Sequence, residues 1–541
     1  MTIRVGSLNL DEKKIWKQIK MDMRDDWFPD ALDYQDYSRS DLLREIIASN
    51  CNANGDYVPA RRYLYNVPKS NFTLRYALET SIVDRAIYHC LVSSLVPAID
   101  PLISWRVFSH RASHSSSEPR SGEKYLFRSG VKAWNDFQGC VEERLSGGKI
   151  LLSTDLANYF EYINISKLRL CIDDLLTSLD SAVEHLVRPH VDQLFSYLRS
   201  WSYDDDRGLP QNRDASSFLA NLYMRPVDCA MEAKGYEYFR YMDDIKIVCD
   251  DESTARRALK DLVLELREIG QFVNSGKTSF DRVPEQVSPE LMRIETAWST
   301  RSLKPIKRTF QPLKDYSLGI LRARAFDSRE FRFCINRLTT LAACEEFAVP
   351  PQYFEEVTSL IIEGLDYSPV TTDVFCRYLR LVDLTQAQVD QLAEHVSIPA
   401  KRIYGFKNYR LWMLFTQRGL STSALLQTAR EIVAQAYDSS TRAGATVYLG
   451  SQGTKQDREL IASRFPSLDS FLGQRAGIIG SHEIHFRGRD GEISIDTHVR
   501  PHLRADLRGT YKALRRQVGV YSSPLEPISI TRYVDTERDY A

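Results

Sequence analysis

The sequence of 541 residues lacks several features that would place it in a class at once. Its nine cysteines are odd in number and include no Cys-x-x-Cys pair, which argues against zinc ligation and against a full set of disulfides. It has no run of about 18 uncharged apolar residues, so we expect no membrane span. The first residues also lack the basic and then apolar pattern of a secretory signal. Together these absences favour free, buried thiols in a reducing cytoplasm.

An excess of charge of either sign is also lacking, because 71 Lys and Arg face 72 Asp and Glu. Proteins that hold a long nucleic-acid duplex usually carry a basic face, since each neutralised phosphate adds affinity. The balance therefore argues against tight binding of a long template, but a local basic groove is compatible with it. Hydrophobic residues make up 43% and charged residues 26%, which is ordinary for a globular protein. The length predicts roughly two to four domains.

The N-terminal part mixes strand-like and helical patterns. Residues 150–155 form a short apolar run that predicts a strand, and residues 238–248 predict two strands around a tight acidic turn. Apolar residues recur at helical spacing over residues 167–198 and 252–269. This alternation predicts an α+β domain over residues 1–310.

After residue 310 glycine becomes sparse, and helical periodicity dominates to about residue 480. One arginine recurs at steps of 33, 32 and 33 residues, at Arg377, Arg410, Arg442 and Arg475. A period of this length is typical of stacked helix pairs, and chance spacing of a common residue is the alternative. We therefore predict an all-α, HEAT-like helical-repeat domain over residues 311–541.

The strongest chemical signal is the segment Tyr241-Met242-Asp243-Asp244. Two adjacent carboxylates repel each other, and a divalent cation relieves that repulsion; a solvated acidic turn is the alternative. Asp155 ends the apolar run 150–155 and adds a third carboxylate. Three carboxylates from two strands can hold two Mg²⁺ ions about 4 Å apart. One ion would activate an attacking hydroxyl and the other would steady a triphosphate and its leaving group. Asp155, Asp243 and Asp244 are thus the predicted metal ligands and catalytic residues.

Four segments, in order, resemble the motifs of reverse transcriptases. They are Asp155–Phe160 for motif A, Gly208–Asn212 with Ser216 and Asn221 for motif B, Tyr241–Asp244 for motif C, and Asn274–Thr278 for motif D. The resemblance covers roughly residues 60–290. It implies a right-hand polymerase with fingers and palm. It also implies an enzyme that adds dNTPs with two Mg²⁺ ions, Mn²⁺ being the alternative metal.

The resemblance assigns roles to residues around the incoming nucleotide. Phe160 matches the aromatic steric gate that excludes a ribose 2′-OH, and a core phenylalanine is the alternative. Gln211 matches the motif B glutamine that lies against the incoming sugar. Asn212 departs from the pattern, because family members usually have glycine there. These roles predict a preference for deoxynucleotides.

Three cations match family positions that contact phosphates. Lys277 corresponds to the motif D lysine near the departing pyrophosphate. Lys69 and Arg75 lie in a segment, residues 68–75, that resembles the part of the fingers that grips the triphosphate. Solvated surface charges are the alternative for all three.

The surroundings of the polymerase motifs resemble the bacterial abortive-infection and unknown-group reverse transcriptases. The likeness rests on the long helical region after the polymerase domain and on the segments Trp134–Phe137 and Tyr159–Ile163. It implies antiphage defence in a bacterial cytoplasm, and homo-oligomers such as trimers or hexamers. Several members of that group add dNTPs without a template and start on a protein hydroxyl, so the product would be single-stranded DNA attached to protein.

A priming hydroxyl must reach the metal pair, where coordination lowers its pKa. Tyr34 and Tyr37 lie in a polar N-terminal stretch and are the candidates, with Tyr540 and others as alternatives. Two other functions stay open. One is a templated reverse transcriptase that copies a dedicated non-coding RNA, and the other is a binding scaffold with an inactive polymerase fold.

Overall fold

The chain folds into two compact units. The computed structural model describes residues 2–5, 8–11, 23, 26–34, 50–52, 57–113, 126–145, 147–281, 288–435, 437–481 and 527–532. The first unit draws its described residues from 1–26, 50–64 and 76–286, and the second from 27–49, 65–75 and 287–541. Short segments near the start of the chain therefore belong with helices that follow hundreds of residues later.

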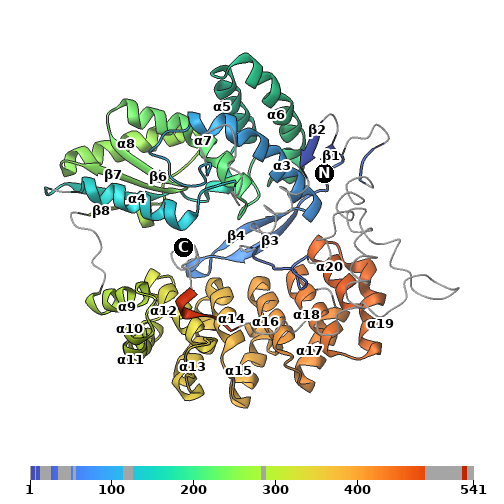
Figure 1. Ribbon diagram of the computed structural model, residues 1–541. Helices are drawn as coiled ribbons and strands as arrows, with labels where there is room; N and C mark the ends of the chain where they lie inside the picture. The colour runs from blue at the N-terminus through green and yellow to red at the C-terminus, as the bar shows by residue number, and fades with distance from the viewer. Residues whose placement is uncertain are drawn as a thin grey trace. The chain divides into compact units, whose positions relative to one another are not determined.

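A four-stranded antiparallel sheet, in the order β6-β7-β5-β8, forms the centre of the first unit (Figure 1). Its strands are β5 (Ile150–Asp155), β6 (Glu237–Tyr241), β7 (Asp244–Cys249) and β8 (Ser279–Asp281). Strand β5 lies inside the sheet, and Ile150, Leu151 and Leu152 are all buried. An apolar run without alternation is what a strand covered on both faces requires.

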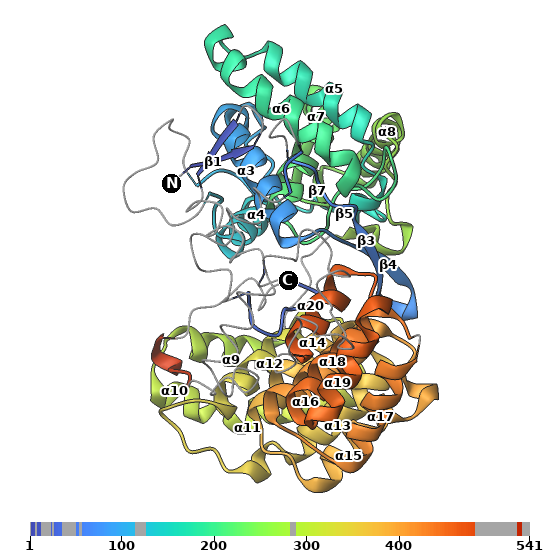
Figure 2. The same cartoon turned by 90° about the vertical axis from the view of Figure 1, so that its right-hand side faces the viewer.

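The helices of the first unit pack around this sheet and against one another. They are α3 (Ile82–Ile99), α4 (Gly130–Arg144), α5 (Ile165–Thr177), α6 (Ser181–Trp201), α7 (Asp214–Ala233) and α8 (Glu252–Ile269). Helix α4 packs through Phe137 and Val141 onto Leu151, Phe239 and Val248. Helices α7 and α8 also contact the sheet, and α5 and α6 pack against each other as a helical hairpin (Figure 2).

One helical stretch, residues 82–102, is long and apolar enough by length and composition to cross a membrane. However, 78% of this stretch is buried inside the protein, as expected for a core helix. Val83, Ile87 and Leu91 have no exposed surface.

Two hairpins complete the strands of the described chain. Strands β1 (Thr2–Val5) and β2 (Leu8–Asp11) pair with each other. Strands β3 (Tyr63–Pro68) and β4 (Leu74–Glu79) form a second hairpin whose tip is the 3₁₀ turn η3 (Ser70–Phe72). Residues 65–75 around that tip belong to the second unit.

The second unit is a double row of helices (Figure 1). They are α9 (Pro289–Ser299), α10 (Leu303–Arg308), α11 (Phe310–Arg322), α12 (Arg329–Ala342), α13 (Glu355–Tyr367), α14 (Thr372–Leu381), α15 (Gln386–Ser397), α16 (Gly405–Arg418), α17 (Ser423–Ala434), α18 (Ser439–Gln452), α19 (Lys455–Arg464) and α20 (Phe471–Gly480). From α11 to α20, each helix packs against the helix two places further along the chain, and against its neighbour in the other row. One apolar core runs through most of this unit.

The recurring arginines lie on every second helix along the chain, and these helices follow one another in one row. Arg377, Arg410, Arg442 and Arg475 lie on α14, α16, α18 and α20. The step of 32 or 33 residues is therefore the length of one helix pair with its loops. Glycines allow close packing in this row, since a Cβ on Gly450 would lie 2.3 Å from the Cα of Gly480.

Candidate active site

Three carboxylates lie at one end of the central strand pair of the first unit. Asp155 ends β5, Asp244 begins β7, and the register places these two residues directly opposite each other. Asp243 lies in the turn between β6 and β7, and its carbonyl accepts a hydrogen bond from Leu156 N at 3.2 Å. Residues far apart in the sequence thus meet because β5 ends where its antiparallel partner β7 begins.

A buried guanidinium supports the turn that carries Asp243. Arg240 has no exposed surface and donates to both oxygens of Asp228, at 2.9 and 2.7 Å. It also donates to Asn221 Oδ1 at 2.9 Å and to the Met242 carbonyl at 3.0 Å. Met242 has φ 57°, a left-handed conformation that is uncommon for a side chain of this size. Arg240 therefore acts as a positioning residue for the acidic turn.

The sequence motifs did not reveal this support. Asn221 was noted only as part of motif B, and Arg240 and Asp228 were missed. Ser109 was missed too, although its hydroxyl accepts a hydrogen bond from Met242 N at 3.1 Å. One signal was available, namely a single arginine inside the apolar strand before the acidic turn, because a buried charge requires a partner.

The carboxylates perturb one another strongly. Burial, and then the charges of Asp155 and Asp244, raise the pKa of Asp243 to about 7. Burial, and then the charge of Asp155, raise the pKa of Asp244 to about 6. Lys277 Nζ lies 2.8 Å from Asp155 Oδ2. Although burial opposes it, the hydrogen bond to Asp155 raises the pKa of Lys277. Full ionisation of Asp243 and Asp244 near neutral pH therefore requires more positive charge than Lys277 supplies.

The residues fit divalent metal ions in chemistry, though their side chains are not arranged as a closed metal cage. In the part of the chain that the structure describes, no three His, Cys, Asp or Glu side chains form a group that could hold a metal ion. The cation that contacts Asp155 is instead the Lys277 ammonium. Carboxylate oxygens are the ligands that Mg²⁺ prefers. A cation would also relieve the repulsion between the carboxylates, which contributes to the raised pKa values of Asp243 and Asp244. Asp155, Asp243 and Asp244 would hold the ions once Asp155 exchanges Lys277 for metal.

Lys277 is positioned by a short turn next to β5. It ends η6 (Ser275–Lys277), and the Asn274 side chain accepts a hydrogen bond from Gly276 N at 3.2 Å. Asn274 N donates to the Asp155 carbonyl at 2.7 Å, which fixes the turn beside the carboxylates. The structure therefore places the predicted motif D lysine with the three acids.

Phe160 and Gln211 lie on two segments that are bonded to each other. Phe160 is half-buried in the turn η5 (Tyr159–Tyr162), and its carbonyl accepts from Leu209 N at 3.0 Å. Gln211 is half-buried in the loop before α7. Asn212, the departure from the usual glycine, has φ 54°, the left-handed conformation that glycine favours and asparagine tolerates. The loop therefore keeps a glycine-like backbone without glycine, and the contacts of Phe160 and Gln211 with a nucleotide stay predictions.

The predicted fingers cations belong to the second unit. Lys69 and Arg75 lie in the β3–β4 hairpin, which Lys69 N closes by donating to the Thr73 carbonyl at 2.7 Å. Lys69 lines a cavity of about 140 Å³ together with Arg324 and Tyr367. These two cations and the carboxylates belong to different units, so a joint contact with a triphosphate stays a prediction.

Of the two priming candidates, Tyr34 is described and Tyr37 lies outside the described residues, as does Tyr540. Tyr34 is half-buried in the second unit, where its N–H donates to Asp30 Oδ1 at 3.0 Å. Asp30 accepts from the Arg475 guanidinium at 2.8 and 3.1 Å, and that guanidinium lies 5.0 Å from the centre of the Tyr34 ring. The recurring arginine of α20 therefore anchors the segment that carries Tyr34.

An antiparallel sheet that presents three carboxylates and a lysine at one strand end is the palm of a nucleotide-polymerising enzyme. Comparison with protein families gives the particular kind, because residues 67–307 match the family described as "Reverse transcriptase (RNA-dependent DNA polymerase)". Residues 67–307 therefore carry a reverse transcriptase domain, a domain type of nucleotidyltransferases that polymerise DNA. The predicted resemblance is thereby confirmed at the level of this domain.

Comparisons with individual proteins add little. No curated protein matches the chain. Among solved structures, the chain is similar to telomerase from Candida albicans in complex with a fragment of telomeric RNA, with 12% identity. That match covers 74% of this chain and 64% of the telomerase chain, which is under two thirds of its length, with a TM-score of 0.29. A score this low supports no conclusion about fold or function.

Proposed function

We propose that this protein is an antiphage defence DNA polymerase that adds dNTPs without a template and starts on one of its own hydroxyl groups. The observation that carries the polymerase part is the meeting of Asp155, Asp243, Asp244 and Lys277 at one strand end. The finer part rests on the resemblance to bacterial abortive-infection reverse transcriptases. It is supported by the double row of helices that follows the matched domain.

The chemistry follows from the residues of the palm. Two Mg²⁺ ions bound by the three aspartates would supply the charge stabilisation for an in-line displacement at the nucleotide's α-phosphorus. Lys277, displaced from Asp155 by metal, would hold its ammonium near the departing pyrophosphate and donate a proton to it. The Phe160 ring would exclude a 2′-OH and so favour dNTPs.

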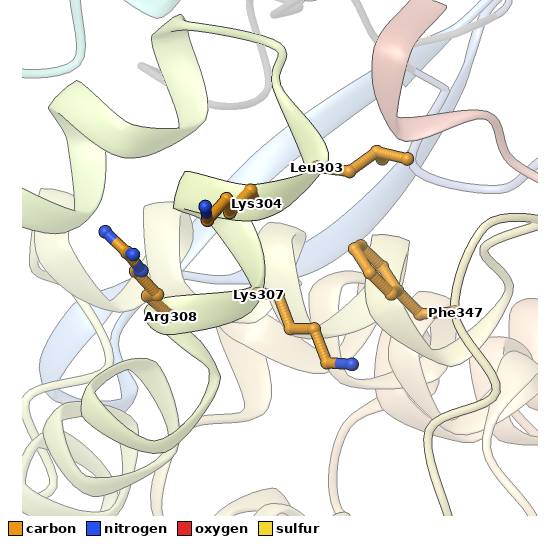
Figure 3. A pocket seen from close by; sticks show the side chains of 5 residues that line it. All are labelled: Leu303, Lys304, Lys307, Arg308 and Phe347. Atoms are coloured by element: carbon orange, nitrogen blue, oxygen red, sulfur yellow. The ribbon is translucent and has the colours of Figure 1, made fainter.

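A basic cavity in the second unit offers a place for the strand. Figure 3 shows Leu303, Lys304, Lys307 and Arg308 of α10, with Phe347, around a cavity of about 440 Å³. Among the described residues, none of these three cations forms an ion pair. Three uncompensated cations beside an aromatic ring suit the phosphates and a base of single-stranded DNA. A protein of net charge −1 thus still has a local basic site.

We also propose that the second unit is a HEAT-like helical-repeat domain and that the enzyme works as a cytoplasmic bacterial homo-oligomer, a trimer or hexamer. The nearly equal steps between the arginines of α14, α16, α18 and α20 support the repeat. Light scattering on the purified full-length protein measures the oligomer, and a monomer would contradict that part.

The test uses purified full-length protein with dNTPs and Mg²⁺ alone. DNA that stays attached to protein after RNase treatment, and whose attachment maps to Tyr34 or Tyr37 by mass spectrometry, supports the proposal. A strict requirement for added or co-purified RNA would favour the alternative, an RNA-templated enzyme that copies a dedicated non-coding RNA.

Asp243→Ala separates an enzyme from a scaffold. We expect this variant to lose at least about 100-fold in nucleotide incorporation, because metal-held charge stabilisation is lost. It should lose phage protection as well, while its thermal unfolding stays cooperative. If the variant incorporates no nucleotide yet gives full phage protection, the protein acts as a binding scaffold and its polymerase fold is not needed for defence.

A further inference from the structure

The second unit holds a cavity beneath the tip of the β3–β4 hairpin. Helix α13, helix α16 and the turn η9 (Pro399–Lys401) form its walls, and Phe72 from the hairpin tip completes it. Its volume is about 300 Å³, at the lower end of the range for small-molecule sites. Among its lining residues, Phe72 alone lies within the matched residues 67–307, and none belongs to motifs A to D.

Two lysines in this cavity share one carboxylate. Lys407 Nζ lies 3.7 Å from Asp366 Oδ1, and Lys401 Nζ lies 3.8 Å from Asp366 Oδ2. The Lys407 side chain is only 4% exposed, and 3.7 Å is too long for a good hydrogen bond. The Lys407 ammonium is therefore held by one long ion pair, and an anion in the cavity would give it a second partner.

The neighbouring histidine does not balance these charges. His395 Nδ1 faces Asp366 Oδ1 at 3.2 Å, and burial, followed by the charge of Lys407, lowers the pKa of His395 to about 4. His395 is therefore neutral at physiological pH. Burial also lowers the pKa of Lys407, and the charge of Asp366 opposes that shift and helps keep the lysine protonated. The charged residues that line the cavity, Lys401, Lys407 and Asp366, carry one net positive charge, while Glu394, which is not a lining residue, also pairs with Lys401 at 3.2 Å.

Two aromatic side chains, Phe72 and Tyr404, line the same cavity. Phe72 is 53% exposed, and Tyr404 OH donates to the Phe72 carbonyl at 3.5 Å. Planar rings next to cations are the combination that recognises a base and its phosphates together.

The hairpin tip is strained where it meets the cavity. Asn71 and Phe72 have φ 57° and φ 60°, and successive left-handed residues other than glycine are unfavourable. Such a conformation persists only where surrounding contacts stabilise it. A ligand that contacts Phe72 would therefore shift the conformational equilibrium of the hairpin tip.

We propose that this cavity is a binding site for a free nucleotide, with its phosphates between Lys401 and Lys407 and its base against Phe72 and Tyr404. The bound nucleotide fixes the hairpin tip and so acts as an effector. The effector role rests on the proposed function, because the same hairpin carries Lys69 and Arg75, which are predicted to contact the incoming triphosphate. The binding itself does not depend on polymerase activity.

Binding is tested on the full-length protein with Asp155→Ala and Asp243→Ala, in EDTA, so that the palm cannot bind a metal–nucleotide complex. Isothermal titration with ATP and dATP should show one site per chain. Adding Lys401→Met or Lys407→Met should weaken it at least tenfold, whereas Lys455→Met, which removes an exposed lysine on α19, should not. Phe72→Ala should weaken the binding of ATP but leave that of inorganic tripolyphosphate unchanged.

Several outcomes would overturn the site. They are unchanged ATP affinity in both lysine variants, equal affinity for ATP and tripolyphosphate, and binding of a 5′-phosphorylated oligonucleotide but not of ATP. The Lys401→Met variant controls for misfolding. The Lys401 side chain is 31% exposed, so its replacement should leave the melting temperature unchanged.

The effector role is tested with intact aspartates. ATP should change the rate of dTTP incorporation at least twofold, and Lys401→Met should remove that change. If the protein binds ATP but its rate of dTTP incorporation does not change, the effector role is wrong. A chain that binds ATP through Lys401 yet makes no DNA would refute the proposed function and leave the nucleotide site standing.

Discussion

Phe160 lies directly downstream of the catalytic strand, on a turn fixed to the motif B loop by the Leu209 hydrogen bond. Because this hydrogen bond holds the backbone of the turn and not the ring, removal of the ring should open space without moving the carboxylates. We expect Phe160→Ala to incorporate ribonucleotides at least tenfold more efficiently relative to dNTPs, measured as the ratio of kcat/KM values. Tyr162→Ala, on the same turn, is the control, and equal selectivity in both variants would make Phe160 an ordinary packing residue.

The coupled acids predict a pH dependence of the metal-free protein. Asp243 and Asp244 have pKa values raised to about 7 and about 6, so the folded protein binds their protons more tightly than the unfolded chain does. Their contribution to stability is therefore complete below about pH 4 and is lost as the pH rises through 6 and 7. In EDTA, the free energy of unfolding in urea should fall over this interval. Asp243→Asn should flatten the fall, and an unchanged slope would contradict the shifted acids.

Metal should reverse this trend in the native enzyme. Divalent ions bind the ionised carboxylates, so their affinity should rise as the pH increases from 6 to 8, and binding should release protons. Titration of Mn²⁺ at the two pH values provides the measurement.

At the scale of elements, the link between helix α7 and strand β6 decides the geometry of the acidic turn. Arg240→Met would leave Asp228, which is 2% exposed, as a buried charge without its cation. We expect a loss on the order of 3–5 kcal/mol in the free energy of unfolding. Arg240→Met combined with Asp228→Leu should recover much of that stability, measured by urea unfolding.

Polymerase activity should separate the two effects. The double variant still lacks the hydrogen bond to the Met242 carbonyl, so incorporation should stay low although stability returns. Recovery of both properties together would show that Arg240 acts only on stability.

The same elements show how far the sequence alone could lead. The acidic turn and Asp155 were predictable, because short apolar runs identify strands and the motifs fix their order along the chain. The Arg240–Asp228 pair joins a strand to a helix, and no local pattern specifies which buried charges will meet. The spacing of the recurring arginines likewise indicated stacked helix pairs, and the structure places these arginines on α14, α16, α18 and α20. It gave no hint that Asp30, 445 residues before Arg475, would bind it, because that contact depends on tertiary packing.

At the scale of the whole molecule, charge balance and local charge must be kept apart. The total of −1 hides the cations of α10, which face a cavity instead of partner carboxylates. Affinity for single-stranded DNA depends on counterion release at such local sites, with a slope of log K against log salt of about −0.7 for each phosphate contacted. Net charge alone is therefore a poor guide to whether this enzyme holds its product.

Replacing Lys304, Lys307 and Arg308 together by Gln should reduce that slope by about 2 if each cation contacts one phosphate. Binding of a fluorescent oligodeoxynucleotide to the full-length protein, measured from 50 to 300 mM salt, gives the slope. A matched triple on α8, Arg256→Gln, Arg257→Gln and Lys260→Gln, removes the same charge from exposed positions of the first unit. If both triples lower the slope equally, the effect belongs to overall charge. A change confined to the α10 triple would mark that cavity as a contact for the strand.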